Sequence, residues 1–316
     1  MNAPLCRVAI VGAGYMAREH TRAFASIPGV SLTGIYSRTN SKAAALAKEF
    51  GIHGVFGSIA ELYEKSKAAL VVVSVPELSA NQVSKSCFAY PWTVLLEKPA
   101  GYNLKDAEDI CAAAQEKSSQ VYVALNRRFY GSTQKALADL ESISGRRFIH
   151  VQDQEDIQAA LKAGQPKEVA DHWMYANSCH VVDYLRLFGR GAIQEVVPII
   201  PWKGPDTDLV LAKVVFESGD VGIYEGIWRG PGPWAVQITT PDKRWELRPL
   251  EQAAVQLAGE RKLQALIPHP YDQDFKPGLK LQAEYAVKAA LGEPTELATI
   301  NDALETMRLI NRIFEK

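Results

Sequence analysis

The chain has 316 residues, 47% of them hydrophobic, which is enough material for two packed domains. Its 35 lysines and arginines nearly balance its 36 acidic residues, so charge gives no reason to expect a nucleic acid or a membrane surface as partner. No apolar run approaches the roughly 20 residues that a membrane helix needs. Four cysteines without CxxC spacing, and an N-terminus that enters a strand pattern without a signal sequence, predict reduced thiols and a cytoplasmic protein.

Residues 7–125 alternate short β-branched runs with alanine-rich helical stretches. Runs such as VAIV at 8–11 and TVLL at 93–96 lack polar alternation, as strands covered on both faces do. This βαβα order is typical of α/β proteins with helices on both faces of the sheet. We therefore predict a doubly wound parallel sheet in an N-terminal domain, 1–125.

The pattern changes after residue 126, where longer segments alternate apolar and polar residues between Gly, Asp and Pro turns. These segments are 146–154, 208–218, 220–229 and 235–241. They predict a C-terminal α+β domain, 126–316, with an open, mainly antiparallel sheet. A helix within 169–189 is expected to end with Gly189 as its C-terminal cap, and a last helix, 300–316, to begin with Asn301 as its cap. That last helix is a candidate for packing back on the N-terminal domain.

The run VAIVGAGYMA at 8–17 has the form of a strand, a glycine turn and a helix. Gly12 permits the tight turn, Gly14 lets a pyrophosphate approach the backbone, and Ala17 lets the helix pack closely on the strand. Tyr15 and Met16 begin the helix, where free N–H groups and the helix dipole favour phosphate. The motif predicts dinucleotide binding; the alternative is a glycine turn with only a structural role.

The choice of dinucleotide is read at the end of the second strand. An NAD enzyme usually places an acidic residue there against the ribose, but no acidic residue occurs between Glu19 and Glu49. Ser37 and Arg38 instead offer the donors that a 2′-phosphate requires. We therefore expect NADP in preference to NAD. The alternative is that Arg38 stacks on the adenine ring and the cofactor is NAD.

The tripeptide Glu97, Lys98 and Pro99 closes the TVLL strand, and ligands of open α/β sheets gather at the carboxyl ends of strands. A lysine at this place can donate to a substrate oxygen, or take a proton from an alcohol as a hydride leaves. The alternative is a solvated surface lysine.

Four segments together resemble the Gfo/Idh/MocA oxidoreductase family, and the resemblance covers essentially the whole chain. They are GAGYMA at 12–17, SVP at 74–76, EKP at 97–99 and the helix with His180 followed by Asp183. The resemblance implies an NAD(P)-binding Rossmann domain and a second domain for substrate binding and oligomerisation, forming a homodimer or homotetramer through its sheet. Most members oxidise or reduce a hydroxyl or carbonyl of a sugar, sugar derivative such as a nucleotide sugar, or cyclic polyol.

By the same resemblance Lys98 is the proton shuttle, and His180 lies near the reacting hydroxyl. Ser74 and Pro76 would border the nicotinamide ribose, and Glu97 would hold the cofactor or orient the lysine. The alternative for His180 is a histidine satisfied within the core.

One position departs from the family pattern. Many members carry an aspartate four residues before the histidine, where this chain has Ala176, so that carboxylate is missing. Asn177 could still hydrogen-bond a sugar hydroxyl, while Asp183 is expected to be structural.

Three further residues are weaker candidates for substrate contact: Arg127, Tyr130 and Tyr175. Arginines at 127 and 128 would suit a carboxylate or phosphate, or else form salt bridges between domains. His20 and His53 are expected to have no partners, and no histidines show ligand spacing for zinc, so no metal site is predicted.

The leading hypothesis is an NAD(P)-dependent oxidoreductase acting on a small carbohydrate-like substrate bound in a cleft between the domains. The alternative is a non-catalytic dinucleotide-binding sensor or assembly protein. A third possibility is an enzyme that keeps its cofactor bound and uses it for a dehydration or an internal redox cycle.

Overall fold

The computed structural model of the protein describes residues 5–315, and these fall into two compact units. The first contains the residues up to Asn126 together with Asp274–Leu304. The second contains Arg127–Gln273 and the chain from Glu305 onward. Residues 274–304, which the sequence pattern placed in the C-terminal domain, therefore group with the first unit.

The first unit is built on a seven-stranded sheet in the order β15-β6-β5-β4-β1-β2-β3. Its strands are β1 (Cys6–Val11), β2 (Val30–Tyr36), β3 (Val55–Phe56), β4 (Leu70–Val73), β5 (Thr93–Glu97), β6 (Val121–Ala124) and β15 (Ala298–Thr299). All neighbours pair in parallel except β15, which is antiparallel to β6. The order 3-2-1-4-5-6 is that of the dinucleotide-binding doubly wound sheet. The predicted fold class of the N-terminal domain is confirmed.

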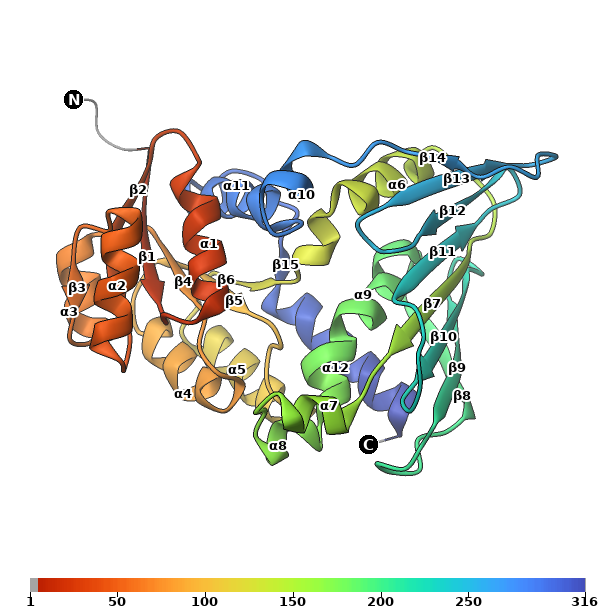
Figure 1. The fold of residues 1–316 in the computed structure, drawn as a ribbon, viewed down its shortest axis with the longest axis horizontal. Helices are drawn as coiled ribbons and strands as arrows, with labels where there is room; N and C mark the ends of the chain where they lie inside the picture. The colour runs from red at the N-terminus through yellow and green to blue at the C-terminus, as the bar shows by residue number, and fades with distance from the viewer. Residues whose placement is uncertain (1–4, 316) are drawn as a thin grey trace. The chain divides into compact units, whose positions relative to one another are not determined.

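Helices cover this sheet and explain why its strands lack polar alternation. They are α1 (Tyr15–Ala25), α2 (Asn40–Phe50), α3 (Ile59–Ser66), α4 (Glu77–Phe88), α5 (Leu104–Glu116) and α11 (Leu279–Ala290). All four residues of β4 are fully buried, as a central strand covered on both faces requires. Helix α11, drawn in blue in Figure 1, packs beside the red helix α1 although the two are far apart in the sequence.

The second unit is built on an eight-stranded sheet in the order β14-β13-β12-β11-β7-β10-β9-β8. Its strands are β7 (Phe148–Gln154), β8 (Ile193–Ile200), β9 (Leu209–Phe216), β10 (Val221–Ile227), β11 (Ala235–Thr239), β12 (Lys243–Leu247), β13 (Ala253–Leu257) and β14 (Gln264–Ala265). Pairing is antiparallel except between β7 and β10. Buried and half-exposed residues alternate along β9 and β10, so one face is covered and the other open. The predicted open, mainly antiparallel sheet is confirmed.

The remaining helical segments lie wholly or mostly in this unit, and they are short apart from α6, α9 and the last helix. They are η1 (Asn126–Phe129), α6 (Gly131–Glu141), α7 (Ile157–Lys162), α8 (Lys167–Ala170), the π-helical turn η2 (Met174–Ser178), α9 (Cys179–Phe188), α10 (Pro270–Asp274) and α12 (Ile300–Phe314). Helix α9 packs against β7 and β11, which places His180 on the covered side of the sheet. Between residues 5 and 315, no helix is both long and apolar enough to cross a bilayer.

Gly189 is the C-terminal cap of α9, and this expectation is confirmed. Its backbone is extended, with φ −76° and ψ 146°. A Cβ at this position would lie 2.4 Å from the ring of Phe216. Glycine is needed here because an aromatic ring packs directly on the backbone.

The cap of α12 is Thr299, and the expectation of Asn301 is wrong. The hydroxyl of Thr299 accepts the backbone N–H of Asp302 at 3.1 Å, and the Asp302 carboxylate accepts the backbone N–H of Thr299 at 2.9 Å. This reciprocal pair is a capping box with aspartate at its third helical position. Asn301 instead accepts a hydrogen bond from Gln115 at 2.9 Å. Strand β15 ends at Thr299 and α12 begins directly after it at Ile300, so Asn301 already lies inside the helix.

Candidate active site

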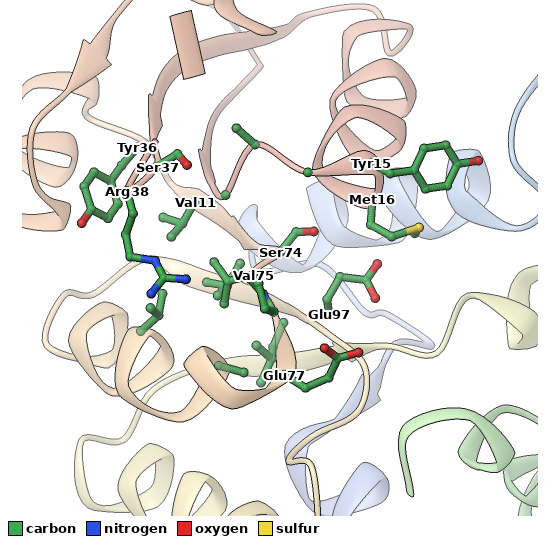
Figure 2. A pocket seen from close by; sticks show the side chains of 18 of the residues that line it. Val11, Tyr15, Met16, Tyr36, Ser37, Arg38, Ser74, Val75, Glu77 and Glu97 are labelled. Carbon is green, nitrogen blue, oxygen red and sulfur yellow. The ribbon is translucent and has the colours of Figure 1, made fainter. Parts of the chain in front are cut away.

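A pocket of about 530 Å³ opens in the first unit where β1 and β4 lie side by side. Chain connections leave these two strands in opposite directions along the sheet, and ligands of doubly wound proteins bind at such a point. The turns that follow β1, β2 and β4 form its walls, together with the end of β5. Figure 2 shows Ser37 and Arg38 at one end and Tyr15, Met16 and Glu97 at the other.

All ten residues that the sequence assigned to the cofactor line this pocket. They are Gly12, Gly14, Tyr15, Met16, Ser37, Arg38, Ser74, Pro76, Glu97 and Lys98. Lys42 and Glu77 also line it and were not singled out. Lys42 lies in the first turn of α2, shortly after Arg38, and a second basic residue in that stretch was a usable signal.

Gly12 is glycine because the protein itself requires it. Its φ is +115°, a conformation that other residues rarely adopt. An added Cβ would lie 1.8 Å from the backbone oxygen of Ser74, which belongs to the neighbouring strand end. The turn after β1 therefore passes too close to the end of β4 for any side chain.

Gly14 has no such internal reason to be glycine. Its φ is −87°, and an added Cβ would meet nothing within 4 Å. The residue lines the pocket, so what a side chain would obstruct is the approach of a ligand to the backbone. This is the place at which the dinucleotide motif brings the pyrophosphate to the chain.

Three helices begin at the pocket, and none of the three has a side-chain cap. They are α1, α2 and α4, which start after Gly14, Thr39 and Pro76. By contrast, α3 and α5 are capped by Ser58 and Asn103, neither of which lines the pocket. Uncapped N-termini present N–H groups and the positive end of the helix dipole, so the pocket suits phosphate groups.

The end of the pocket beside β2 is basic. Arg38 and Lys42 line it together with the hydroxyl residues Ser37 and Thr39. Both basic residues are exposed in this structure, and the stretch from 36 to 42 contains no acidic residue. Such donors can bind an anionic group of a ligand.

Glu97 is held in place from two sides at the end of β5. Its Oε1 lies 2.6 Å from Nε2 of His20, which is 1% exposed on α1. Its Oε2 accepts the backbone N–H of Lys98 at 3.1 Å. The expectation that His20 has no partner is therefore wrong. Helix α1, which starts at the dinucleotide turn, thereby holds the strand end that carries Lys98.

In the second unit, His180 lies in a cluster of aromatic and basic side chains. It is 8% exposed, and its ring centroid is 6.4 Å from that of Trp234. The guanidinium carbon of Arg127 lies 3.9 Å from the ring centroid of Trp234, a cation–π contact. Arg127 and His180 are thus brought to the same aromatic ring.

The other candidate residues of this unit are buried or hydrogen-bonded within the protein. Tyr175 is 2% exposed, and its hydroxyl donates to Asn311 at 2.9 Å. Tyr130 is 5% exposed, and burial raises its pKa. The side-chain amide of Asn177 donates to both oxygens of Glu155, at 2.9 and 3.0 Å.

Arg128 and Asp183 form a buried ion pair inside this unit. Two guanidinium nitrogens of Arg128 donate to the two carboxylate oxygens at 2.6 and 2.7 Å. Burial by itself would raise the pKa of Asp183, but the charge and hydrogen bonds of Arg128 outweigh it and leave that pKa below its usual value. Thr306 donates to the same carboxylate at 2.8 Å. The ion pair joins η1 to α9, and the bond from Thr306 joins α9 to α12.

Comparison with known families identifies the segment of the chain that forms the pocket. Residues 6–125 match the model of the Gfo/Idh/MocA oxidoreductases, a family described by its NAD-binding Rossmann fold. This match assigns the dinucleotide-binding segment of the chain, residues 6–125, to the Gfo/Idh/MocA family. The matched segment ends one residue before the chain enters η1.

The chain is similar over part of its length to a curated enzyme. Glucose-6-phosphate 3-dehydrogenase of Bacillus subtilis is 27% identical over 123 residues. The match covers 39% of this chain but only 34% of that enzyme, so it spans about a third of the relative.

Solved structures of low identity share the fold along almost the whole chain. The UDP-N-acetylglucosamine 3-dehydrogenase of Acidithiobacillus ferrooxidans has a TM-score of 0.78 at 15% identity, covering 98% of this chain and 96% of that one. Levoglucosan dehydrogenase, solved with NADH and levoglucosan, has a TM-score of 0.80 at 17% identity, with the same two coverages of 98% and 96%.

Within residues 5–315, no group of three or more His, Cys, Asp or Glu side chains is placed to hold a metal ion. In the described part of the chain the four cysteines are buried and form no disulfide, and burial raises the pKa of Cys6 to about 11 and that of Cys87 to about 12. Such thiols stay protonated at neutral pH and are poor nucleophiles.

Proposed function

We propose that the protein is an NAD(P)-dependent oxidoreductase that transfers hydride between the nicotinamide and a hydroxyl or carbonyl carbon of a sugar, nucleotide sugar or cyclic polyol. The observation that carries the proposal is that one pocket is lined both by the dinucleotide turn and by Lys98. The match of residues 6–125 to the Gfo/Idh/MocA family supports the oxidoreductase class. The likeness to two sugar dehydrogenases and to levoglucosan dehydrogenase supports a carbohydrate-like substrate.

The chain's own residues would bind the cofactor along the pocket. The open N-terminus of α1, with Gly14 leaving room at the backbone, would hold the pyrophosphate. Ser74 and Pro76 would border the nicotinamide ribose, near Lys98. The bound nicotinamide supplies the hydride donor or acceptor.

Lys98 is proposed as the proton shuttle. As an alcohol is oxidised, its hydroxyl proton passes to Nζ while the carbon gives up its hydride; reduction of a carbonyl reverses both transfers. Glu97 takes no proton in this scheme, since its oxygens are held by His20 and by the Lys98 backbone. His180 is proposed to position or polarise the reacting oxygen.

NADP is proposed as the preferred cofactor, because Arg38 and Lys42 offer two positive charges at the end of the pocket where NAD enzymes place an acid. A solved neighbour binds NADH, so the preference depends on these side chains and not on the fold. Titration of the purified protein with NADPH and with NADH, followed by nicotinamide fluorescence, tests it directly.

Arg38→Ala should weaken NADPH binding by about 10- to 100-fold, the loss of a charged hydrogen-bonding partner, and change NADH binding much less. Lys48→Ala is the matched control, because Lys48 is exposed on α2, the helix that follows Arg38, and does not line the pocket. Equal losses for both dinucleotides would contradict the NADP assignment.

Lys98→Ala should lower kcat/KM by about 10²- to 10⁴-fold, the usual contribution of a positioned acid or base. NADPH affinity should change little, because the phosphates are held elsewhere in the pocket. Lys105→Ala, at an exposed lysine of α5 outside the pocket, is the control. Turnover that survives in Lys98→Ala at the wild-type rate would remove the proposed role.

A further inference from the structure

Two carboxyl groups are buried side by side in the second unit and take no part in the proposed chemistry. Asp153 lies in β7, and Glu155 is the first residue after that strand. Asp153 is 1% exposed and Glu155 is 2% exposed. Residues two apart in extended chain point to the same face, so both side chains enter the covered side of the sheet. There they meet η2 and the N-terminal end of α9, the helix that carries His180.

Both carboxyls are surrounded by neutral hydrogen-bond donors. The hydroxyl of Tyr224 donates to Asp153 Oδ2 at 2.8 Å. The indole N–H of Trp173 donates to Glu155 Oε2 at 2.6 Å, and the Asn177 amide donates to both oxygens of Glu155. In the part of the chain that the structure describes, neither carboxyl forms an ion pair. Two adjacent buried negative charges without a cation in contact would be strongly unfavourable.

One proton resolves this conflict. Burial and the adjacent Asp153 raise the pKa of Glu155 well above its usual value. Burial also raises the pKa of Asp153, although hydrogen bonds from Ser178, Glu155 and Tyr224, and the charge of Arg127, oppose that rise. Both pKa values are raised, as expected for two adjacent buried carboxyls that share one proton. We place that proton on Glu155.

Unmade hydrogen bonds around the pair agree with this placement of the proton. The second oxygen of Asp153, Oδ1, is buried without a donor in strict hydrogen-bond geometry, and so is the hydroxyl of Ser178. A carboxylic O–H on Glu155, together with the Ser178 hydroxyl, can supply the donors that this carboxylate needs.

We propose that Asp153 and Glu155 hold a single proton between them, and that this pair fixes the turn η2 and thereby the position of His180. Trp173 immediately precedes η2, Asn177 lies within it, and Ser178 is its last residue before α9. Trp173 and Asn177 donate to Glu155, and the Ser178 hydroxyl lies beside Asp153. Glu155 and Asp153 are positioning residues. Their effect on turnover rests on the proposed function, whereas the shared proton does not.

A π-helical turn is wider and less favourable than an α-helical one, so it needs side-chain contacts to hold it. Here the contacts converge on one carboxyl group, that of Glu155. Loss of the shared proton would place two negative charges in contact and weaken the hold on η2. The groups that face the pair, namely Tyr224, Trp173, Asn177, Ser178 and Arg127, include only one cation to offset a second charge.

Infrared spectroscopy tests the proton without any substrate. Wild-type protein at neutral pH should show the carbonyl stretch of a neutral carboxylic acid, and Glu155→Gln should lack it. Glu225→Gln is the matched control, because Glu225 lies on the neighbouring strand β10, is 29% exposed and pairs with His150. Identical spectra for wild type and Glu155→Gln would overturn the proposal. A pH titration of the wild-type band gives the same decision if the variant does not fold.

Stability against pH gives a second test. A carboxyl whose pKa is raised by folding stabilises the folded state fully at pH values below its pKa in the unfolded chain, which is near 4.5. This stabilisation is lost as the pH rises. One such proton changes the unfolding constant tenfold per pH unit, so the Tm of wild type should fall about 3 °C per pH unit more steeply than that of Glu155→Gln above that value. Parallel curves would contradict the assignment of the proton to Glu155.

Hydrogen exchange tests the positioning. In Glu155→Leu, amides of residues 173–180 should exchange at least about tenfold faster, because losing the buried hydrogen bonds costs about 1.4 kcal/mol or more. Glu155→Gln, which can still accept from Asn177 and donate to Asp153, should restore wild-type protection. Unchanged exchange in Glu155→Leu would overturn the positioning role. If NADPH fails to bind, the proposed function is wrong. These three measurements would still show whether Asp153 and Glu155 share a proton and hold η2.

Discussion

Gly12 and Gly14 stand two residues apart in one turn, yet they are glycine for different reasons. The first avoids a clash within the protein, with the backbone of Ser74. The second leaves open space at the mouth of a helix. A glycine motif read from sequence cannot separate these roles, because both residues satisfy the same spacing. The distinction needs the position of the neighbouring strand.

The two roles should separate by mutation. Gly12→Ala should destabilise the protein by about 1–3 kcal/mol, the cost of a side chain in a forbidden backbone region, before any clash is added. Gly14→Ala should cost less than about 1 kcal/mol, since its φ is ordinary for alanine. NADPH affinity should nevertheless fall in Gly14→Ala. Chemical denaturation and fluorescence titration measure the two effects, and equal destabilisation by both variants would contradict this account.

Other residue contacts could not be predicted because they join distant parts of the chain. His20 and Glu97 are 77 residues apart, and no local pattern pairs them. Asp153 and Glu155 were readable only as polar positions in an alternating strand. That they point inward, toward neutral donors and not toward water, follows from the register of β7 with β10 and β11.

At the scale of elements, long periodic segments were predictable and short ones were not. The parallel strands of the first sheet and the strands β9 and β10 follow directly from their patterns. Strand β3 has two residues, too few for any period. The π-helical turn η2 has the composition of an ordinary helix, and we propose that its contacts with Glu155 hold its form.

The start of α12 gives a prediction at this scale. Thr299→Ala should cost about 1 kcal/mol of stability, because the helix loses the side chain that accepts its Asp302 amide. Ser142→Ala serves as a surface control, since that residue follows the end of α6 and its hydroxyl is exposed. Urea denaturation measures both, and a loss in Thr299→Ala no larger than in the control would refute the capping assignment.

At the scale of the whole molecule, the alternation of strands and helices was sufficient to predict a doubly wound sheet followed by an open antiparallel one. The pattern could not show that residues 274–304 return to the first unit. Nothing in the local sequence of α11 states which of two sheets it will cover. Assembly of this chain into a homodimer or homotetramer through the second sheet stays a prediction.

That return has a consequence for how the protein is made. Helix α11 packs on α1, β4 and β5, and β15 pairs with the edge of β6. A ribosome therefore releases six strands of the nucleotide-binding sheet long before the pieces that cover and finish it. During that interval the apolar side of α1 and the free edge of β6 are exposed to other chains. A chaperone that binds nascent chains would find its target in the first 126 residues until α11 and β15 have been made.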